Sequence, residues 1–275
     1  MKNRSRVKGV TLIVCIVCAL FFTSAAKGVE TNLIDTPTAH VLGAGEYFLR
    51  FRFYQEGGIL IKGSAGLTER LTIGASYGGV GVIGTETIKG NPEPAFSLKY
   101  KLGEEGENMP FALAVGYEGQ GYGKYYYRGE TITIDEVGGV LNRSFYQINS
   151  KGFYLALSKE FEELHLNIHG GVNHSLEDDP GKPGVSFFLG GEFEVTPNFS
   201  LKLEYNNGFH DKIGLKDVSD AAVDKLLRQA GGEINLGLKI QYSPHLILEI
   251  DFKDLSGRYT EAGNRTFQIT YSGEF

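Results

Sequence analysis

Residues 267–275 alternate strictly between two kinds of side chain. One parity carries Phe267, Ile269, Tyr271, Gly273 and Phe275, and the other parity is polar throughout. A repeat of two residues predicts a β-strand with one apolar face and one polar face. Chain ends in soluble domains are usually frayed and polar. This strand is therefore expected to place its aromatic face against an apolar environment.

The same repeat recurs along the chain from residue 46 onward. In the first segment, Arg50 and Arg52 alternate with aromatic and aliphatic residues. Each segment is near the ~9–11 residues that a tilted membrane strand requires. The pattern predicts twelve strands, at 46–55, 58–67, 71–80, 94–102, 110–119, 151–160, 164–174, 184–194, 199–206, 233–242, 246–254 and 266–275.

The connections between these segments also alternate, in length. Short turns are expected at 68–70, 103–109, 161–163, 195–198 and 243–245. Longer links fall between them, at 81–93, 120–150, 175–183, 207–232 and 255–265, and only the link near Glu56 is also short. Short periplasmic turns and long outer loops are typical of outer-membrane barrels. The sequence therefore predicts an all-β, antiparallel transmembrane β-barrel of 12 strands, or of 14 if 122–148 adds two wall strands.

Aromatic residues on the apolar parity fall into two rings, as expected for the two membrane interfaces. One ring lies at the turn end and comprises Tyr47, Phe111, Phe161, Phe193, Phe199, Tyr242 and Phe275. The other lies at the loop end and comprises Phe53, Tyr77, Phe96, Tyr117, Phe153, Tyr205, Phe252 and Phe267. The last strand, with Phe267, Ile269, Tyr271 and Phe275, resembles the signal that the barrel-assembly machinery reads. Outer-membrane lipid and that machinery are thus the expected partners.

The N-terminus has the pattern of an export signal. Basic residues between Lys2 and Lys8 precede an apolar run over 10–22, and Ser24–Ala26 supplies small residues for cleavage. Cleavage is expected after Ala26. The chain then divides into a signal peptide (1–26), a periplasmic lead-in (27–45) and the barrel (46–275), and the location is the bacterial outer membrane.

Composition narrows the function classes. Removing residues 1–26 takes four basic residues and no acidic one, so Lys+Arg falls from 27 to 23 against 33 Asp+Glu. The net charge moves from −6 to −10, which argues against nucleic acid as a partner. Both cysteines, Cys15 and Cys18, lie in the signal segment. The exported chain would therefore have no disulfide and no cysteine-based site.

A family resemblance covers about residues 32–120. Asn32–His40 followed by Gly45, the strand–turn–strand Gly66–Gly74, and Pro94–Tyr100 leading to Pro110–Gly119 resemble the YjbH-like outer-membrane family. Members of that family are linked to exopolysaccharide production or export. The resemblance therefore implies a barrel with a role in polysaccharide export.

Charged residues on the inward-facing parity are distributed unevenly along the chain, with basic residues first and acidic residues later. Inward basic residues come early and are Arg50, Arg52, Lys62, Lys99 and Lys101. Inward acidic residues come later and are Glu118, Glu192, Glu204, Glu249 and Asp251. In an open pore these opposite walls would orient polar solutes. In a filled barrel, Arg50 and Arg52 would pair with Glu249 and Asp251 near the closing seam.

Other candidate sites are weaker. His165 and His169 stand too far apart on one strand to bind a metal together. His174 faces outward, but its neighbour Ser175 points the other way, so an esterase pair is not formed. The outer link 120–150 holds Tyr122, Tyr125, Tyr126 and Tyr127, which could stack on sugar rings or belong to a hairpin of the wall.

These observations favour a non-enzymatic channel or envelope-transport component for small polar or saccharide solutes, without cofactor or metal. The alternatives are a closed barrel that acts as a partner in exopolysaccharide export or envelope assembly, and an outer-membrane lipid esterase or deacylase.

Overall fold

The computed structural model describes residues 31–134, 137–141, 144–177, 184–207, 215–216, 232–256 and 265–275. The expected signal peptide lies outside these residues. Within the described ranges, no helix has the length and apolar character needed to cross a bilayer.

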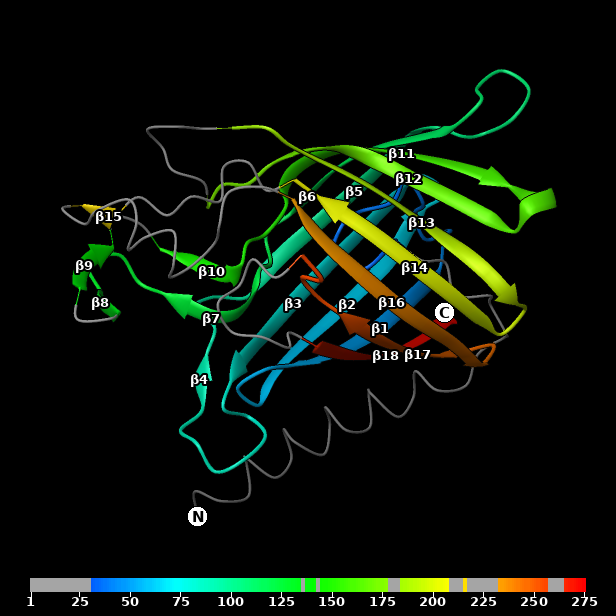
Figure 1. Cartoon of the computed structure of the whole chain (residues 1–275). Helices are drawn as coiled ribbons and strands as arrows, with labels where there is room; N and C mark the ends of the chain where they lie inside the picture. Colours follow the sequence, from blue (N-terminus) through cyan, green and yellow to red (C-terminus); the bar gives the residue numbers. More distant parts are fainter. Residues whose placement is uncertain are drawn as a thin grey trace, which may run out of the picture.

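Twelve strands form one closed antiparallel sheet (Figure 1). They are β1 (Glu46–Tyr54), β2 (Gly58–Thr68), β3 (Leu71–Val80), β5 (Ala95–Gly103), β6 (Ala112–Glu118), β11 (Gly152–Phe161), β12 (Leu166–His174), β13 (Ser186–Thr196), β14 (Phe199–Asn206), β16 (Glu233–Ser243), β17 (Leu246–Phe252) and β18 (Arg265–Glu274). Each strand pairs with its sequence neighbours in the wall, and β1 pairs with β18 to close the cylinder. The predicted barrel of 12 strands is confirmed, and the alternative of 14 is wrong.

The segment expected to add two wall strands forms small sheets outside the wall. β7 (Tyr122–Tyr126) pairs with β10 (Phe145–Ile148), while β8 (Thr131–Ile134) pairs with β9 (Val137–Leu141), which also pairs with β15 (Leu215–Lys216). β4 (Lys89–Gly90) is a short addition to β3. These pieces gather at the loop end of the barrel (Figure 1). They turn away from the wall because β6 and β11 already pair directly with each other.

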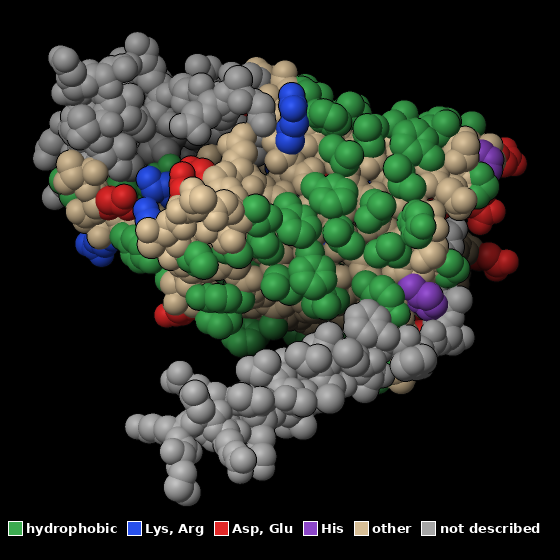
Figure 2. Space-filling model, turned by 90° about the horizontal axis from the view of Figure 1, so that it is seen from below, with side chains coloured by type: hydrophobic (Ala, Val, Ile, Leu, Met, Phe, Trp, Pro, Cys, Tyr) green, Lys and Arg blue, Asp and Glu red, His purple; other side chains and the backbone are tan. Residues whose placement is uncertain are grey.

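The outer face of the wall is apolar. The exposed large side chains of the strands stand on the parity that the sequence assigned to lipid, with Leu203 exposed by 55 % and Phe96 by 68 %. Figure 2 shows one side of this surface, where hydrophobic side chains cover a broad area. Aromatic pairs join neighbouring strands at both ends, Tyr47 with Phe275 and Phe53 with Phe267. In a closed barrel the backbone N–H and C=O groups are hydrogen-bonded between strands, so a wall with apolar outer side chains is suited to contact with lipid.

The segment before β1 does not behave as the periplasmic lead-in that the sequence suggested. Residues 31–44 run inside the barrel as a narrow hairpin, here called the lumen hairpin. Its arms are joined by hydrogen bonds of Leu33 to Thr36 and of Thr38 to Thr31. Most of its residues, including Ile34 and Ala39, are buried. Gly45, at φ 86°, turns the chain into β1 at the turn end.

Wall glycines make room for the lumen hairpin. A β-carbon on Gly66 would lie 1.9 Å from the Gly43 carbonyl oxygen, and one on Gly190 would lie 2.3 Å from the Leu33 side chain. A larger residue at position 66 would collide with the hairpin backbone, and one at position 190 would force the Leu33 side chain to move. The barrel interior is therefore shaped around the segment it contains.

Candidate functional site

Glu204 of β14 is the centre of the contact between wall and lumen hairpin. This carboxylate is fully buried. One of its oxygens accepts hydrogen bonds from the backbone N–H groups of Ile34 (3.0 Å), Asp35 (2.9 Å) and Thr36 (2.9 Å), and from the Thr36 hydroxyl (2.8 Å). The other oxygen accepts from Asn235 (3.0 Å). Consecutive N–H groups around one anion form a backbone nest, so the hairpin turn is held by charge.

Cationic side chains of the wall hold the carbonyl groups of the same hairpin. Lys202 Nζ donates to the Leu33 carbonyl (2.9 Å) and pairs with Glu249 (2.6 Å). Lys99 Nζ donates to the carbonyls of Thr38 (2.8 Å) and Thr31. Both lysines are almost fully buried. A buried charge is costly without partners, and here the hairpin backbone supplies them.

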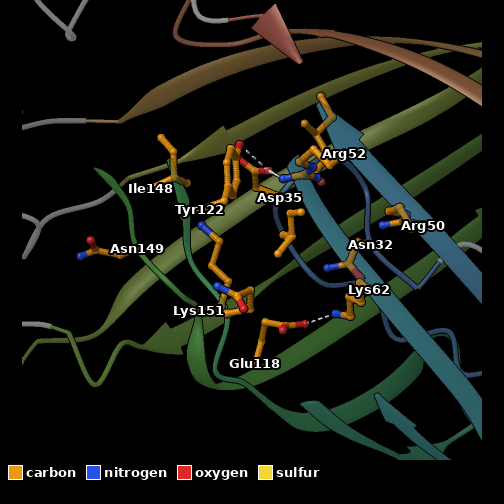
Figure 3. Close-up of a pocket in the computed structure, with 13 residues that line it drawn as sticks. Asn32, Asp35, Arg50, Arg52, Lys62, Glu118, Tyr122, Ile148, Asn149 and Lys151 are labelled. Carbon is orange, nitrogen blue, oxygen red and sulfur yellow. Dashed lines mark hydrogen bonds and ion pairs between the residues drawn. The ribbon is translucent and has the colours of Figure 1, made fainter. Parts of the chain in front are cut away.

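The hairpin tip carries one carboxylate, Asp35, near the loop end. Arg52 Nη1 lies 2.6 Å from it, Lys253 forms a second ion pair, and the Tyr122 hydroxyl donates at 3.0 Å. Arg52 Nη2 also donates to the Ile34 carbonyl (2.8 Å). Figure 3 shows Asp35 between Tyr122 and Arg52. Three separate parts of the chain therefore converge on this side chain.

Nearer the turn end, wall hydroxyl groups accept hydrogen bonds from the hairpin backbone. The Ala39 N–H donates to Ser158 Oγ (2.8 Å), and the Leu42 N–H donates to Thr72 Oγ1 (2.9 Å). Ser158 Oγ also lies 2.8 Å from His169 Nδ1. Ser158 and His169 are both buried beneath the hairpin. Hydrogen bonds thus follow the hairpin from one end of the lumen to the other.

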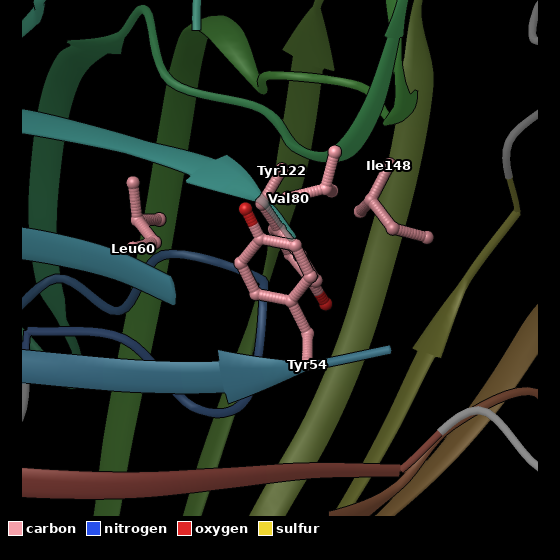
Figure 4. Packing of buried hydrophobic residues seen from close by; sticks show 5 residues of the cluster. All are labelled: Tyr54, Leu60, Val80, Tyr122 and Ile148. Carbon is pink, nitrogen blue, oxygen red and sulfur yellow. The ribbon is translucent and has the colours of Figure 1, made fainter. Parts of the chain in front are cut away.

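The loop end of the lumen is covered by β7 and β10. Tyr122 and Ile148 pack against Tyr54, Leu60 and Val80 of the wall (Figure 4). Below this cover, beside Asp35, a cavity of about 60 Å³ remains. Four cationic and two anionic residues line it, namely Arg50, Arg52, Lys62 and Lys151, and Asp35 and Glu118.

The structure places the sequence-predicted charges on the lumen parity of the strand register, where they have local partners. The ion pairs are Lys62 with Glu118, Lys101 with Glu104, and Glu192 with Lys239. Arg50 Nε donates to Thr270, and Asp251 accepts from Thr266 and Gln268. The expected pairing of Arg52 with Glu249 or Asp251 is wrong, because the hairpin brings Asp35 to Arg52 while Lys202 reaches Glu249.

The loop tyrosines are divided by the fold. Tyr122 is buried in the lumen cover, whereas Tyr127 is 53 % exposed. Tyr125 and Tyr126 are half-buried and pack against Tyr146 and Phe145. Burial raises the pKa of the Tyr146 phenol to about 12. Tyr127 is therefore the most exposed of the four rings.

Three residues of the site were missed by the sequence reasoning. Asp35 was assigned to a lead-in, Lys151 to a strand edge, and Lys253 was overlooked. Lys253 shares the parity of Glu249 and Asp251, so extending the alternation by one step would have found it. Asp35 and Lys151 carry no comparable pattern. In the part of the chain that the structure describes, no group of His, Cys, Asp and Glu is arranged to hold a metal ion.

Two features characterise the molecule: the apolar outer face of its barrel wall and the hairpin that is hydrogen-bonded inside the lumen. The chain is a β-barrel with an apolar outer wall and a plugged lumen, here called the plugged barrel. No family model matches the sequence, and no curated protein does.

Solved structures with a similar fold include two porins and an outer-membrane channel. The NanC porin has 10 % identity and a TM-score of 0.42 over 83 % of this chain and 99 % of that one. The KdgM porin in complex with disordered oligogalacturonate has 6 % identity and a TM-score of 0.45 over 84 % and 99 %. An outer-membrane channel from Pseudomonas putida F1 has 14 % identity and a TM-score of 0.36 over 86 % and 97 %.

Proposed function

We propose that the plugged barrel is a gated, non-enzymatic channel of the outer membrane for small polar or saccharide solutes, and that the lumen hairpin is its gate. The observation that carries the proposal is the set of charged wall residues that contact the hairpin. Glu204, Lys202, Lys99 and Arg52 bind it through polar contacts. Without the hairpin these groups would line a charged, water-accessible passage.

The strength of these contacts implies a closed resting state. A single intramolecular hydrogen bond contributes about 0.5–1.5 kcal/mol, and more when one partner is charged. If these contacts together favour the closed form by only ~5 kcal/mol, the open form stays below about one molecule in a thousand. Opening therefore requires a ligand or a force that weakens the contacts.

The path of the hairpin is compatible with withdrawal toward the turn end. Its tip, with Asp35, lies near the loop end, while Gly43 and Leu42 lie beside Gly66 and Thr72 near the turn end. The two arms run side by side, so neither arm encircles a wall strand. Withdrawal along the barrel axis breaks hydrogen bonds without breaking the wall.

Planar-bilayer conductance tests this function. The wild type should open rarely, whereas Lys202→Gln with Glu204→Gln should raise the frequency of conductance steps at least tenfold. Lys101→Gln with Glu104→Gln removes an ion pair at the turn end whose partners do not contact the hairpin, and should leave the frequency near that of the wild type. If the wild type and all variants are silent while correctly folded, the channel function is wrong.

A second function is favoured by one observation. The motif that resembles the YjbH-like family, Asn32–His40, lies within the lumen hairpin. On that basis a permanently closed barrel would serve as a partner in exopolysaccharide export or envelope assembly. Silence of every variant in the bilayer, together with loss of polysaccharide secretion on deletion of the gene, would favour this role.

A further inference from the structure

We propose that Asp35 occupies an anion-binding site of the lumen, and that a small solute bearing a carboxylate competes with Asp35 for this site and so releases the lumen hairpin. This inference rests on the proposed channel function and names its ligand class and trigger. It begins with the charge of the hairpin. Within residues 31–45, Asp35 is the only acidic or basic residue apart from a histidine.

The surroundings of Asp35 have the composition of a carboxylate site. Arg52 and Lys253 provide two cations, and the Tyr122 phenol provides a neutral donor. The Asp35 side chain is 6 % exposed. Charge-assisted hydrogen bonds from Arg and Lys to a carboxylate are among the strong ones in proteins. The wall would offer the same donors to any carboxylate of similar size.

The cavity beside Asp35 carries more positive charge than its acids balance. Lys62 pairs with Glu118, but Lys151 is more than nine-tenths buried, and its ammonium has no hydrogen bond or ion pair to any residue that the structure describes. Lys151 lines the cavity, and a cation in this closed lumen without an ion-pair partner is costly. A second anionic or polar group of an incoming solute would supply that partner.

The space present is small, which explains why displacement is needed. A cavity of about 60 Å³ admits a few water molecules, not a sugar acid. A solute that enters the cavity can bind fully only if Asp35 leaves. Binding and plugging are then mutually exclusive, and by linkage each weakens the other by the same factor.

Arg52 makes the release cooperative. One of its amino groups holds the Asp35 carboxylate and the other holds the Ile34 carbonyl. A solute carboxylate that binds the guanidinium bidentately would take both donors at once. The hairpin tip would then lose two contacts in one binding event.

Isothermal titration of the folded protein with sodium glucuronate tests the site, with glucose as the neutral control at constant ionic strength. Asp35→Asn keeps the size of the side chain and removes the competitor, so glucuronate should bind about tenfold more tightly than to the wild type. Arg52→Gln and Lys151→Gln should each weaken binding, whereas Lys239→Gln, a lumen lysine outside the site, should not. Heat-modifiable migration of every variant verifies that the barrel is folded.

Inorganic phosphate is titrated in parallel. Weaker binding of phosphate than of glucuronate supports a carboxylate site, and equal or tighter binding of phosphate overturns it. Equal binding of glucuronate to wild type and Asp35→Asn, or equal binding of glucuronate and glucose, also overturns the proposal. Since the titration needs no conduction, a silent barrel that shows the expected competition would refute only the channel function. A conducting barrel that shows no competition would refute only this inference.

Discussion

Leu203 and Glu204 are neighbours in β14, yet they belong to two environments with different rules. Leu203 is 55 % exposed on the outer face, where any apolar side chain of suitable size serves. Glu204 is fully buried in the lumen, where it accepts four hydrogen bonds from three consecutive residues of the hairpin. Every strand meets the same requirement on the outer face, which is an apolar side chain toward the lipid. The lumen is a set of individual contacts, so it can carry specificity.

The largest expected effect on stability comes from substituting Glu204, the lumen-facing residue of this pair. Glu204→Ala leaves the N–H groups of Ile34, Asp35 and Thr36 without an acceptor in a buried site. Removing one partner of a buried charged contact costs about 3–5 kcal/mol. Hydrogen exchange of these three amides should accelerate correspondingly. Glu204→Gln keeps an acceptor and should show a smaller effect, and equal protection in Ala and wild type would contradict the role of the carboxylate.

The outer side of the pair should respond less strongly. Leu203→Arg places a charge near the middle of the apolar band, where the cost is ~2–4 kcal/mol. Urea unfolding of the protein in lipid vesicles measures it. Tyr242→Arg, at the turn end of β16, should cost only ~0–1 kcal/mol because the interface is close. Similar costs at the two positions would mean that the band is not embedded as described.

Charge coupling sharpens the comparison at the hairpin tip. Asp35→Asn and Arg52→Gln should be non-additive in thermal stability, with a coupling of roughly 0.5–3 kcal/mol, because the two side chains share an ion pair. Arg52→Gln with Glu192→Gln should be additive within about 0.5 kcal/mol, since Glu192 is paired with Lys239. Additivity of both pairs would show that Asp35 does not hold the hairpin tip.

The smallest expected effect lies in the turn between β5 and β6. The Glu105 carboxylate accepts a hydrogen bond from Lys159, which lowers the pKa of Glu105 below its ordinary value. A lowered folded-state pKa contributes stability above the unfolded pKa and loses it as pH falls through the folded pKa. For so exposed a pair the contribution is at most about 1 kcal/mol.

Titration of Glu105 by NMR in wild type and Lys159→Gln measures this contact directly. The pKa of Glu105 should rise in the variant toward its ordinary value. An unchanged pKa would show that the pair does not form in solution.

The wall was predictable from the sequence because each strand repeats the same alternation of outward apolar and inward polar side chains. Alternation in 46–55 places Phe51 outward and Arg52 inward whatever the partners are, and a short turn at 68–70 requires β2 and β3 to be neighbours. The number of strands was harder, because 122–126 and 145–148 have strand-forming residues. Their exclusion from the wall follows from the direct pairing of β6 with β11, a contact between distant segments.

The site was predictable only in part. Parity identified Arg52, Lys99 and Glu204 as lumen residues, but it says nothing about partners. The lumen hairpin has little periodicity of its own, since Thr36, Pro37 and Thr38 suit many extended conformations. Its structure is set by charges far away in the chain. No local pattern records such contacts, which is why Asp35 and its partners became visible only in the fold.

The position of the hairpin has a consequence for the kinetics of folding. The hairpin precedes every wall strand, yet the contact of Ile34 with Glu204 spans 170 residues and that of Asp35 with Lys253 spans 218. Contacts of such sequence separation form slowly because long loops must close first. The hairpin must enter either before β1 and β18 join or afterwards through the turn end. On either route, the segment synthesised before the wall reaches its final partners only after β14 and β17 are in place.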